Sequence, residues 1–145
     1  MQDHLAVDRF TTLAIGDTAT STKTVTDTDV VLYAAVTGDL NPMHVDEAIA
    51  GASRFGARIA HGMLTAGHLS ALMAAQLPGP GAVYVSQSLR FVRPVRIGDA
   101  ITSRVEVREL FPAKRIVQLA TTCSNQHGKI VLDGVAMILV PAEVS

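Results

Sequence analysis

The sequence predicts a single α+β domain in which an antiparallel sheet curls around one enclosed helix. Three observations support this fold class: the length of the chain, a long apolar helical segment, and a run of strands after it. The chain has 145 residues, which is the size of one ordinary domain spanning residues 1–145. Hydrophobic residues make up 48% and charged residues 17%, so much of the chain must be buried and intrinsic disorder is excluded.

Residues 61–77 form the strongest helical segment, because most of them are good helix formers. The segment is apolar nearly all round, which predicts a helix enclosed by other elements. The stretch from Ile59 to Leu89 has no charged residue, but polar side chains interrupt it. A membrane-spanning helix needs about 20 consecutive apolar residues, so a buried helix is the better interpretation and no membrane partner is expected. Met1–His4 lack the features of a secretory signal, which favours a cytoplasmic protein.

Period-two alternation follows this helix and predicts four strands, joined by short connections as an antiparallel meander. The four segments are Val83–Phe91, Ile101–Val107, Val117–Cys123 and Lys129–Val140.

Shorter elements are predicted before the long helix. Thr18–Thr26 is rich in threonine and valine, as strands are. Thr28–Thr37 is expected to be a helix, with Thr26 or Asp27 as its N-cap and Gly38 at its end. Asp39–Asp46 is predicted to be a loop, and Asp46 can cap a second short helix through Ala52.

The composition excludes several classes of function. The net charge is −1, tryptophan is absent and aromatic residues are 4%, so no basic surface or stacking platform for nucleic acid is expected. Cys123 is the single cysteine; it excludes an internal disulfide and is expected to be a small buried hydrophobe. His61 and His68 would lie about 10.5 Å apart along a helix, too far to share a zinc ion. His68 is expected to be hydrogen-bonded core.

The Asp39–Asp46 loop carries the residues best suited to acid–base chemistry. A carboxylate, an amide and an imidazole lie on this short loop, which Pro42 stiffens. They belong to Asp39, Asn41 and His44. Asp39 can orient a water molecule and accept its proton, while His44 can give or take a proton near neutral pH. The alternative is structural: Asp39 closes the preceding helix, Asn41-Pro42 makes a turn, and His44 packs.

Ala60–Met63, at the start of the long helix, form a second candidate element. The first turn of a helix has free N–H groups and a partial positive charge. Gly62 lacks a Cβ, so a substrate carbonyl could approach its N–H, which would stabilise an oxyanion or enolate. The alternative is that Gly62 lets a strand pack closely and that His61 is a partly buried polar residue rather than a pocket wall.

These two motifs, in this order, resemble those of the MaoC-like family of hot-dog-fold hydratases, and most of all the (R)-specific enoyl-CoA hydratases that feed polyhydroxyalkanoate synthesis. The resemblance spans about Thr18 to Val140. The segments that carry it are Thr37–Asp46, Ile59–Leu64, Leu77–Gly81, Ser88–Phe91, Arg93–Val95 and Gly98–Asp99.

The resemblance implies a hot-dog homodimer that hydrates trans-2-enoyl-CoA to (R)-3-hydroxyacyl-CoA. Asp39 and His44 would be catalytic and Asn41 supporting. The N–H of Gly62 would bind the thioester oxygen, and the substrate would also be bound by residues of the same helix. These binding residues are His61, Met63 and Gly67. No metal or redox cofactor would be needed, and coenzyme A would be part of the substrate.

Other activities on the same fold are alternatives to hydration. Dehydration in fatty-acid or polyketide synthesis is the reverse reaction at the same site. A thioesterase would place a carboxylate on or beside the central helix, but no Asp or Glu occurs between Ala48 and Gly98. A non-catalytic acyl-CoA-binding subunit would lose the acid–base pair. Three arginines could bind coenzyme A phosphates or simply end strands in solvent: Arg90, Arg93 and Arg96.

Overall fold

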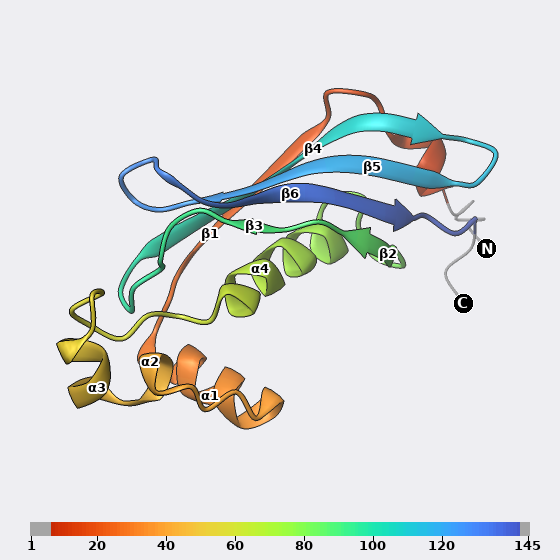
Figure 1. Ribbon diagram of the computed structural model, residues 1–145. Coiled ribbons are helices and arrows are strands. Elements are labelled where there is room, and N and C mark those ends of the chain that lie inside the picture. Colours follow the sequence, from red (N-terminus) through yellow and green to blue (C-terminus); the bar gives the residue numbers. More distant parts are fainter. Residues whose placement is uncertain (1–6, 143–145) are drawn as a thin grey trace, which may run out of the picture.

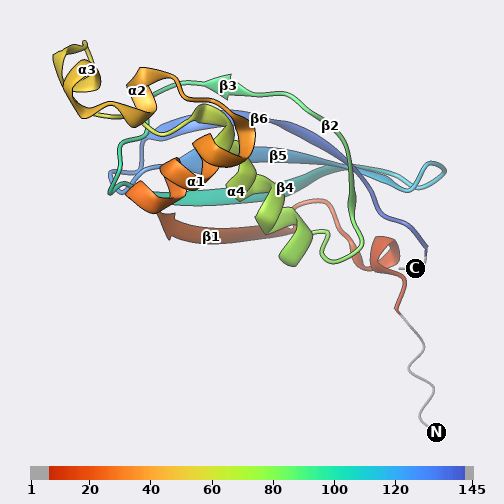
Figure 2. The same cartoon turned by 90° about the horizontal axis from the view of Figure 1, so that it is seen from below.

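Figure 1 shows the computed structural model of the chain, which describes residues 7–142; Met1–His4, discussed above, lie outside these residues. An antiparallel sheet forms one layer, and the helices lie against one of its faces (Figures 1 and 2). The strands are β1 (Thr18–Thr24), β2 (Val83–Gln87), β3 (Arg90–Phe91), β4 (Ala100–Phe111), β5 (Ile116–Ser124) and β6 (Ile130–Leu139). The helices are the 3-10 turn η1 (Arg9–Thr12), α1 (Asp27–Thr37), α2 (Pro42–Val45), α3 (Glu47–Ala52) and α4 (Gly62–Ala75). The predicted α+β class is confirmed.

The strand order is β1-β4-β5-β6-β2, with β3 also pairing with β6. The predicted meander is therefore correct for β4 to β6 and wrong for the strand before them. The reason lies in residues 92–96, which pair with other segments instead of folding back on β3. Val92 donates to Val131 of β6, and Ala60 donates to the carbonyl of Val95. This path carries the chain away from β3 and delivers it to β4, on the far side of β5.

The predicted strand Val83–Phe91 is divided into β2 and β3. The residues between them lie directly against Gly134 of β6, where an added Cβ would be 1.8 Å from the carbonyl oxygen of Ser88. Ser88 is also tied to the neighbouring Val135, since each backbone N–H of this pair is bonded to an oxygen of the other residue. The absence of a side chain at Gly134 thus allows the interrupted strand to stay on the sheet.

The predicted caps of the short helices are confirmed. Thr26 and Asp29 form a reciprocal capping box at the start of α1, and Gly38 ends it in the left-handed conformation with φ 78°. Asp46 caps α3 through the N–H of Ile49. The predicted loop between these helices is wrong in one respect, because it contains the single turn α2, which has proline at its start and Asn41 as its N-cap.

Helix α4 packs against β1, β4 and β5 through its buried face. That face is made of Thr65, Ala66, Leu69, Leu72 and Met73. The prediction of an enclosed helix is only half right, because the opposite face is open: the side chain of Met63 is 54% exposed. A single sheet can bury only one side of a helix. An apolar sequence pattern does not show whether the other side is buried by the same chain or by another one.

Cys123 is fully buried, as predicted, and burial raises the pKa of its thiol. None of the helices within residues 7–142 is long and apolar enough to cross a bilayer.

Gly134→Ala is expected to destabilise the protein by about 1–3 kcal/mol, because its methyl group would overlap the backbone of Ser88. Urea unfolding at a fixed protein concentration measures the effect. Gly51→Ala is the matched control: it lies in α3, and an added Cβ meets nothing within 4 Å, so it should be neutral or slightly stabilising. Equal urea midpoints for the two variants would contradict the close approach of Ser88 to Gly134.

Candidate active site

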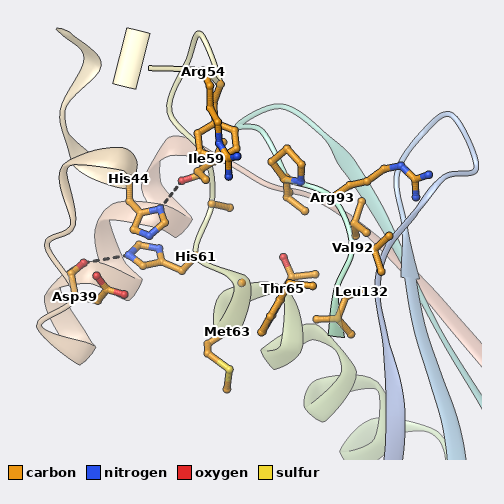
Figure 3. A pocket seen from close by; sticks show the side chains of 17 residues that line it. Asp39, His44, Arg54, Ile59, His61, Met63, Thr65, Val92, Arg93 and Leu132 are labelled. Carbon is orange, nitrogen blue, oxygen red and sulfur yellow. Dashed lines mark hydrogen bonds between the residues drawn. The ribbon is translucent and has the colours of Figure 1, made fainter. Parts of the chain in front are cut away.

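A cavity of about 470 Å³ lies at the N-terminal end of α4. Figure 3 shows that its walls come from the loop after α1, from the segment that leads into α4, and from the chain around β3. The lining includes Asp39, His44, Ile59, His61, Gly62, Met63, Thr65, Phe91, Arg93 and Leu132. Both motifs singled out in the sequence therefore meet in one place.

Asp39 is held by residues close to it in sequence. Its N–H donates to Oγ1 of Thr37 at 3.2 Å, and its Oδ1 accepts the N–H of Asn41 at 3.2 Å. Its Oδ2 accepts no hydrogen bond from residues 7–142. One carboxylate oxygen is thus fixed by the backbone and the other is left to act on a ligand.

The imidazole of His44 is fixed in one orientation. Its Nδ1 lies 2.7 Å from the carbonyl oxygen of Ile59. A carbonyl can only accept, so Nδ1 must carry the proton of this bond. In the neutral ring Nε2 then holds the free lone pair, which is the atom that can take a proton from a ligand.

His61 lies between these groups and is only 2% exposed. Its Nε2 is 3.1 Å from the carbonyl oxygen of Asp39, and its ring stacks on those of His44 and Tyr33, with centroids 3.9 and 4.5 Å away. Its Nδ1 is buried and finds no partner among the described residues. Burial lowers the pKa of His61, which favours the neutral ring.

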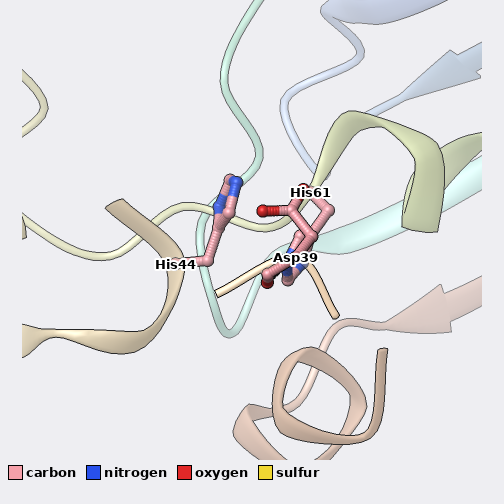
Figure 4. Close-up of side chains that lie close together, drawn as sticks. All are labelled: Asp39, His44 and His61. Atoms are coloured by element: carbon pink, nitrogen blue, oxygen red, sulfur yellow. Dashed lines mark hydrogen bonds between the residues drawn. The ribbon is translucent and has the colours of Figure 1, made fainter. Parts of the chain in front are cut away.

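Asp39, His44 and His61 each offer a ligand atom within 4.8 Å of the others (Figure 4). Such a cluster could hold a metal ion by distance alone. However, each imidazole already has one nitrogen on a backbone carbonyl, and the other nitrogen of His61 is shut away from solvent. The arrangement suits acid–base chemistry on a water molecule better, with one carboxylate oxygen and one imidazole nitrogen free to reach it.

Gly62 is the first residue of α4, and no carbonyl among the described residues accepts its backbone N–H. The N–H is therefore free to bind an oxyanion at the cavity wall. The ring of Phe91 also packs onto this glycine, and an added Cβ would lie 2.5 Å from the ring. Both explanations of the glycine, a free donor and close packing, thus fit the geometry.

Two predicted site residues lie elsewhere. The side chain of Asn41 accepts the N–H of Met43 at 3.1 Å and so caps α2, while its backbone, not its amide, orients Asp39. Gly67 lines a different cavity of about 400 Å³ between α1 and α4, together with His68. The prediction that His68 is hydrogen-bonded core fails for its Nδ1, which has no partner within residues 7–142.

Two of the three candidate arginines lie outside the cavity and interact with other protein groups at the surface. Arg90 pairs with Asp133, and Arg96 donates to the carbonyl of Phe55. Arg93 lines the cavity and donates to the carbonyl of Ile130.

Sequence reasoning missed Arg58, which is 9% exposed. Its Nε donates to the carbonyl of His44 at 2.6 Å, and its Nη1 pairs with Asp27 and Glu47. It therefore joins the loop of Asp39 and His44 to the starts of α1 and α3. The signal in the sequence was weak: an arginine next to a long uncharged stretch.

Comparison with known proteins identifies the fold and the family. Residues 12–128 match the MaoC-like domain. The chain belongs to this family. It is 46% identical over 140 residues to an (R)-specific enoyl-CoA hydratase of Rhodospirillum rubrum, covering 97% of this chain and 96% of that protein. It is 49% identical over 141 residues to a 3-hydroxybutyryl-CoA dehydratase of Methylorubrum extorquens, covering 97% and 89%.

Solved structures of MaoC-like relatives agree with the sequence matches. The R-hydratase PhaJ1 of Pseudomonas aeruginosa, in its unliganded form, superposes with a TM-score of 0.88 at 46% identity, over 92% of this chain and 86% of that one. The (R)-hydratase of Aeromonas caviae, described as involved in PHA biosynthesis, gives a TM-score of 0.86 at 40% identity, over 89% and 98%. The hot-dog fold and the family resemblance expected from the sequence are thus confirmed.

Two histidines of this MaoC-like domain predict a loss of stability as the pH falls below about 6.5. Burial lowers the pKa of both His61 and His68 in the folded protein. The unfolded chain takes up these protons at about pH 6.5 and the folded chain does not, so acid favours unfolding. Carboxylates whose pKa is lowered by folding, such as Asp29 with a pKa of about 2, contribute in the same direction only at lower pH.

Urea unfolding at several pH values measures this slope. His61→Gln and His68→Gln should each flatten the dependence of the unfolding free energy on pH in that window, whatever their effect at pH 8. An unchanged slope in both variants would show that the two rings are protonated equally well in the folded and unfolded states.

Proposed function

We propose that this protein hydrates trans-2-enoyl-CoA to (R)-3-hydroxyacyl-CoA in a reversible reaction. One observation carries the proposal: an oriented carboxylate and an oriented imidazole, those of Asp39 and His44, meet at a cavity whose wall also offers the free N–H of Gly62. Support also comes from the named activities of the relatives, an (R)-specific enoyl-CoA hydratase and a 3-hydroxybutyryl-CoA dehydratase at 46% and 49% identity.

The proposed reaction gives each group a defined role. Asp39 and His44 hold one water molecule: Oδ2 of Asp39 accepts a hydrogen bond from one O–H, and Nε2 of His44 accepts the other proton as the oxygen bonds to C3. The π electrons move toward the thioester oxygen, where the N–H of Gly62 stabilises the developing enolate. The imidazolium of His44 then gives this proton from Nε2 to C2, which returns the ring to its neutral Nδ1–H form. One water is consumed and no redox change occurs.

No metal or redox cofactor is needed in this scheme, because the unsaturated thioester already makes C3 electrophilic. Coenzyme A is part of the substrate, as the thiol component of its thioester. Dialysis against EDTA should leave the hydration rate unchanged; a loss of rate that added Zn²⁺ or Mg²⁺ restores would contradict the metal-free proposal and turn the cluster of Asp39, His44 and His61 into a metal site.

The nearest alternatives share the fold. Dehydration of a 3-hydroxyacyl thioester is the reverse reaction, and a mitochondrial 3-hydroxyacyl-[acyl-carrier-protein] dehydratase of Arabidopsis thaliana is 39% identical over 134 residues. A thioesterase is less well supported, because α4 carries no carboxylate that could activate water for the carbonyl carbon. A non-catalytic acyl-CoA binder is less well supported because Asp39 and His44 are both present and oriented.

We further propose that the protein is a homodimer. The edge strand β2 exposes apolar side chains, with Val83 49% and Val85 55% exposed, whereas the opposite edge, β1, is mostly threonine. An unpaired apolar edge is a template for pairing with another strand. A second copy would also cover the open face of α4, where Met63 is exposed.

Asp39→Asn and His44→Ala should each lower the rate of crotonyl-CoA hydration by about 10²–10⁴-fold, the usual contribution of a general acid or base. The loss of absorbance of the conjugated enoyl thioester measures the rate. Asp46→Asn is the matched control, since it makes the same carboxylate-to-amide change in the same loop and asparagine also caps helices. Near-normal turnover in either site variant would refute the assigned roles, and release of free thiol without hydration would favour a thioesterase.

Val85→Lys should shift the protein from a dimer toward the 15.3 kDa monomer, because it places a charge on the apolar edge. Light scattering measures the mass. Thr20→Lys, on the polar edge strand β1, should leave the dimer intact. A wild-type protein with the mass of one chain would contradict the dimer.

A further inference from the structure

We propose that His61 is a positioning residue: it fixes the carboxylate of Asp39 and the imidazole of His44 relative to each other without exchanging protons with the substrate. The inference rests on the proposed hydration, in which these two groups must reach one water molecule. His61 is well placed for this task, since it is the N-cap of α4 and contacts both catalytic residues.

The first contact joins His61 to the backbone of Asp39. Nε2 of His61 must be the donor to the carbonyl 3.1 Å away, because a carbonyl oxygen has no proton to give. The other hydrogen bonds of Asp39 in the described chain reach only two residues along the sequence, to Thr37 at the end of α1 and to Asn41. The bond from His61 is therefore the one among residues 7–142 that joins Asp39 to a segment distant in sequence, the start of the packed helix α4.

The second contact is with the ring of His44. The two imidazole centroids are 3.9 Å apart with an angle of 30° between the planes, and the ring of Tyr33 also packs against His61, with the centroids 4.5 Å apart. The edge of the His44 ring is held by the carbonyl of Ile59. The face of the His44 ring is held by the ring of His61, so the His44 ring cannot tilt away from the cavity without losing its contact with His61.

His61 is poorly suited to be a proton donor or acceptor itself. Its Nε2 is engaged, and its Nδ1 is buried without a partner among the described residues. The groups that face the ring are His44, Asp39 and Tyr33, and burial is the main cause that lowers the pKa of His61. A neutral ring at this position allows His44 to become positively charged without a second cation beside it.

Three substitutions separate the two contacts. His61→Phe keeps a stacking ring and loses the donor, His61→Gln keeps a donor and loses the ring, and His61→Ala loses both. A displacement of about 1 Å in a catalytic group can cost about 10²-fold in rate. We expect kcat for crotonyl-CoA hydration to fall about 10²-fold in His61→Ala and less in the other two, with KM changed by less than about threefold.

The controls keep this inference apart from the proposed function. His68→Gln, at a half-buried histidine of the same helix outside the Asp39 cavity, should retain wild-type kcat. Histidine ¹⁵N spectra give a readout besides activity: His44 should show one fixed Nδ1–H tautomer in the wild type and a mixture in His61→Ala. Unfolding midpoints exclude variants that fail to fold.

Three results would overturn the inference. Wild-type kcat and an unchanged His44 tautomer in folded His61→Ala would show that His61 positions nothing. A rise in KM alone would make it a wall of the substrate pocket. Loss of a whole limb of the pH–rate profile in His61→Phe, with His44 still in one tautomer, would make it a proton-transfer group. If the wild type hydrates no enoyl-CoA, the proposed function itself is wrong; if Asp39→Asn is inactive and the His61 variants are normal, only this inference is wrong.

Discussion

The candidate site depends on hydrogen bonds that fasten the loop of Asp39 and His44, residues 39–44, to the segment that enters α4, residues 58–61. His61 donates to the carbonyl of Asp39, and Ile59 donates to the carbonyl of Met43. Arg58 donates to the carbonyl of His44, whose ring in turn donates to the carbonyl of Ile59. These bonds join residues far apart in sequence, and they all use backbone carbonyls or N–H groups. The loop is thus held by its main chain and by Nδ1 of His44, which leaves one oxygen of Asp39 and Nε2 of His44 free.

The rigidity of the second segment comes from α4. The helix is packed on the sheet through Leu69 and Met73, both 2% exposed or less, so its first turn provides a fixed reference for the loop and for the N–H of Gly62. The same uncharged character that buries this helix denies it a catalytic carboxylate. Acid–base chemistry is thereby restricted to the loop, and the helix contributes a backbone donor and the buried ring of His61.

Local signals predicted the elements well and the long-range pairings poorly. The caps at Thr26 and Asp46 and the stop at Gly38 follow from short-range backbone chemistry, and all three are observed. The place of β2 beside β6 depends on the hydrogen-bond partners of residues 92–96. These partners are distant in sequence, so no local pattern predicts them. Asn41 shows the same limit inside the site: an Asn before a Pro in a loop fits both a catalytic amide and a helix cap, and the structure shows the cap.

The central claim is that Asp39 and His44 add the two parts of one water molecule across an enoyl double bond. Hydration of crotonyl-CoA in D₂O, followed by chiral analysis and NMR of the product, tests it most directly. The account predicts (R)-3-hydroxybutyryl-CoA with a single deuterium at C2. Free coenzyme A with an intact double bond, or no reaction at all, would contradict it.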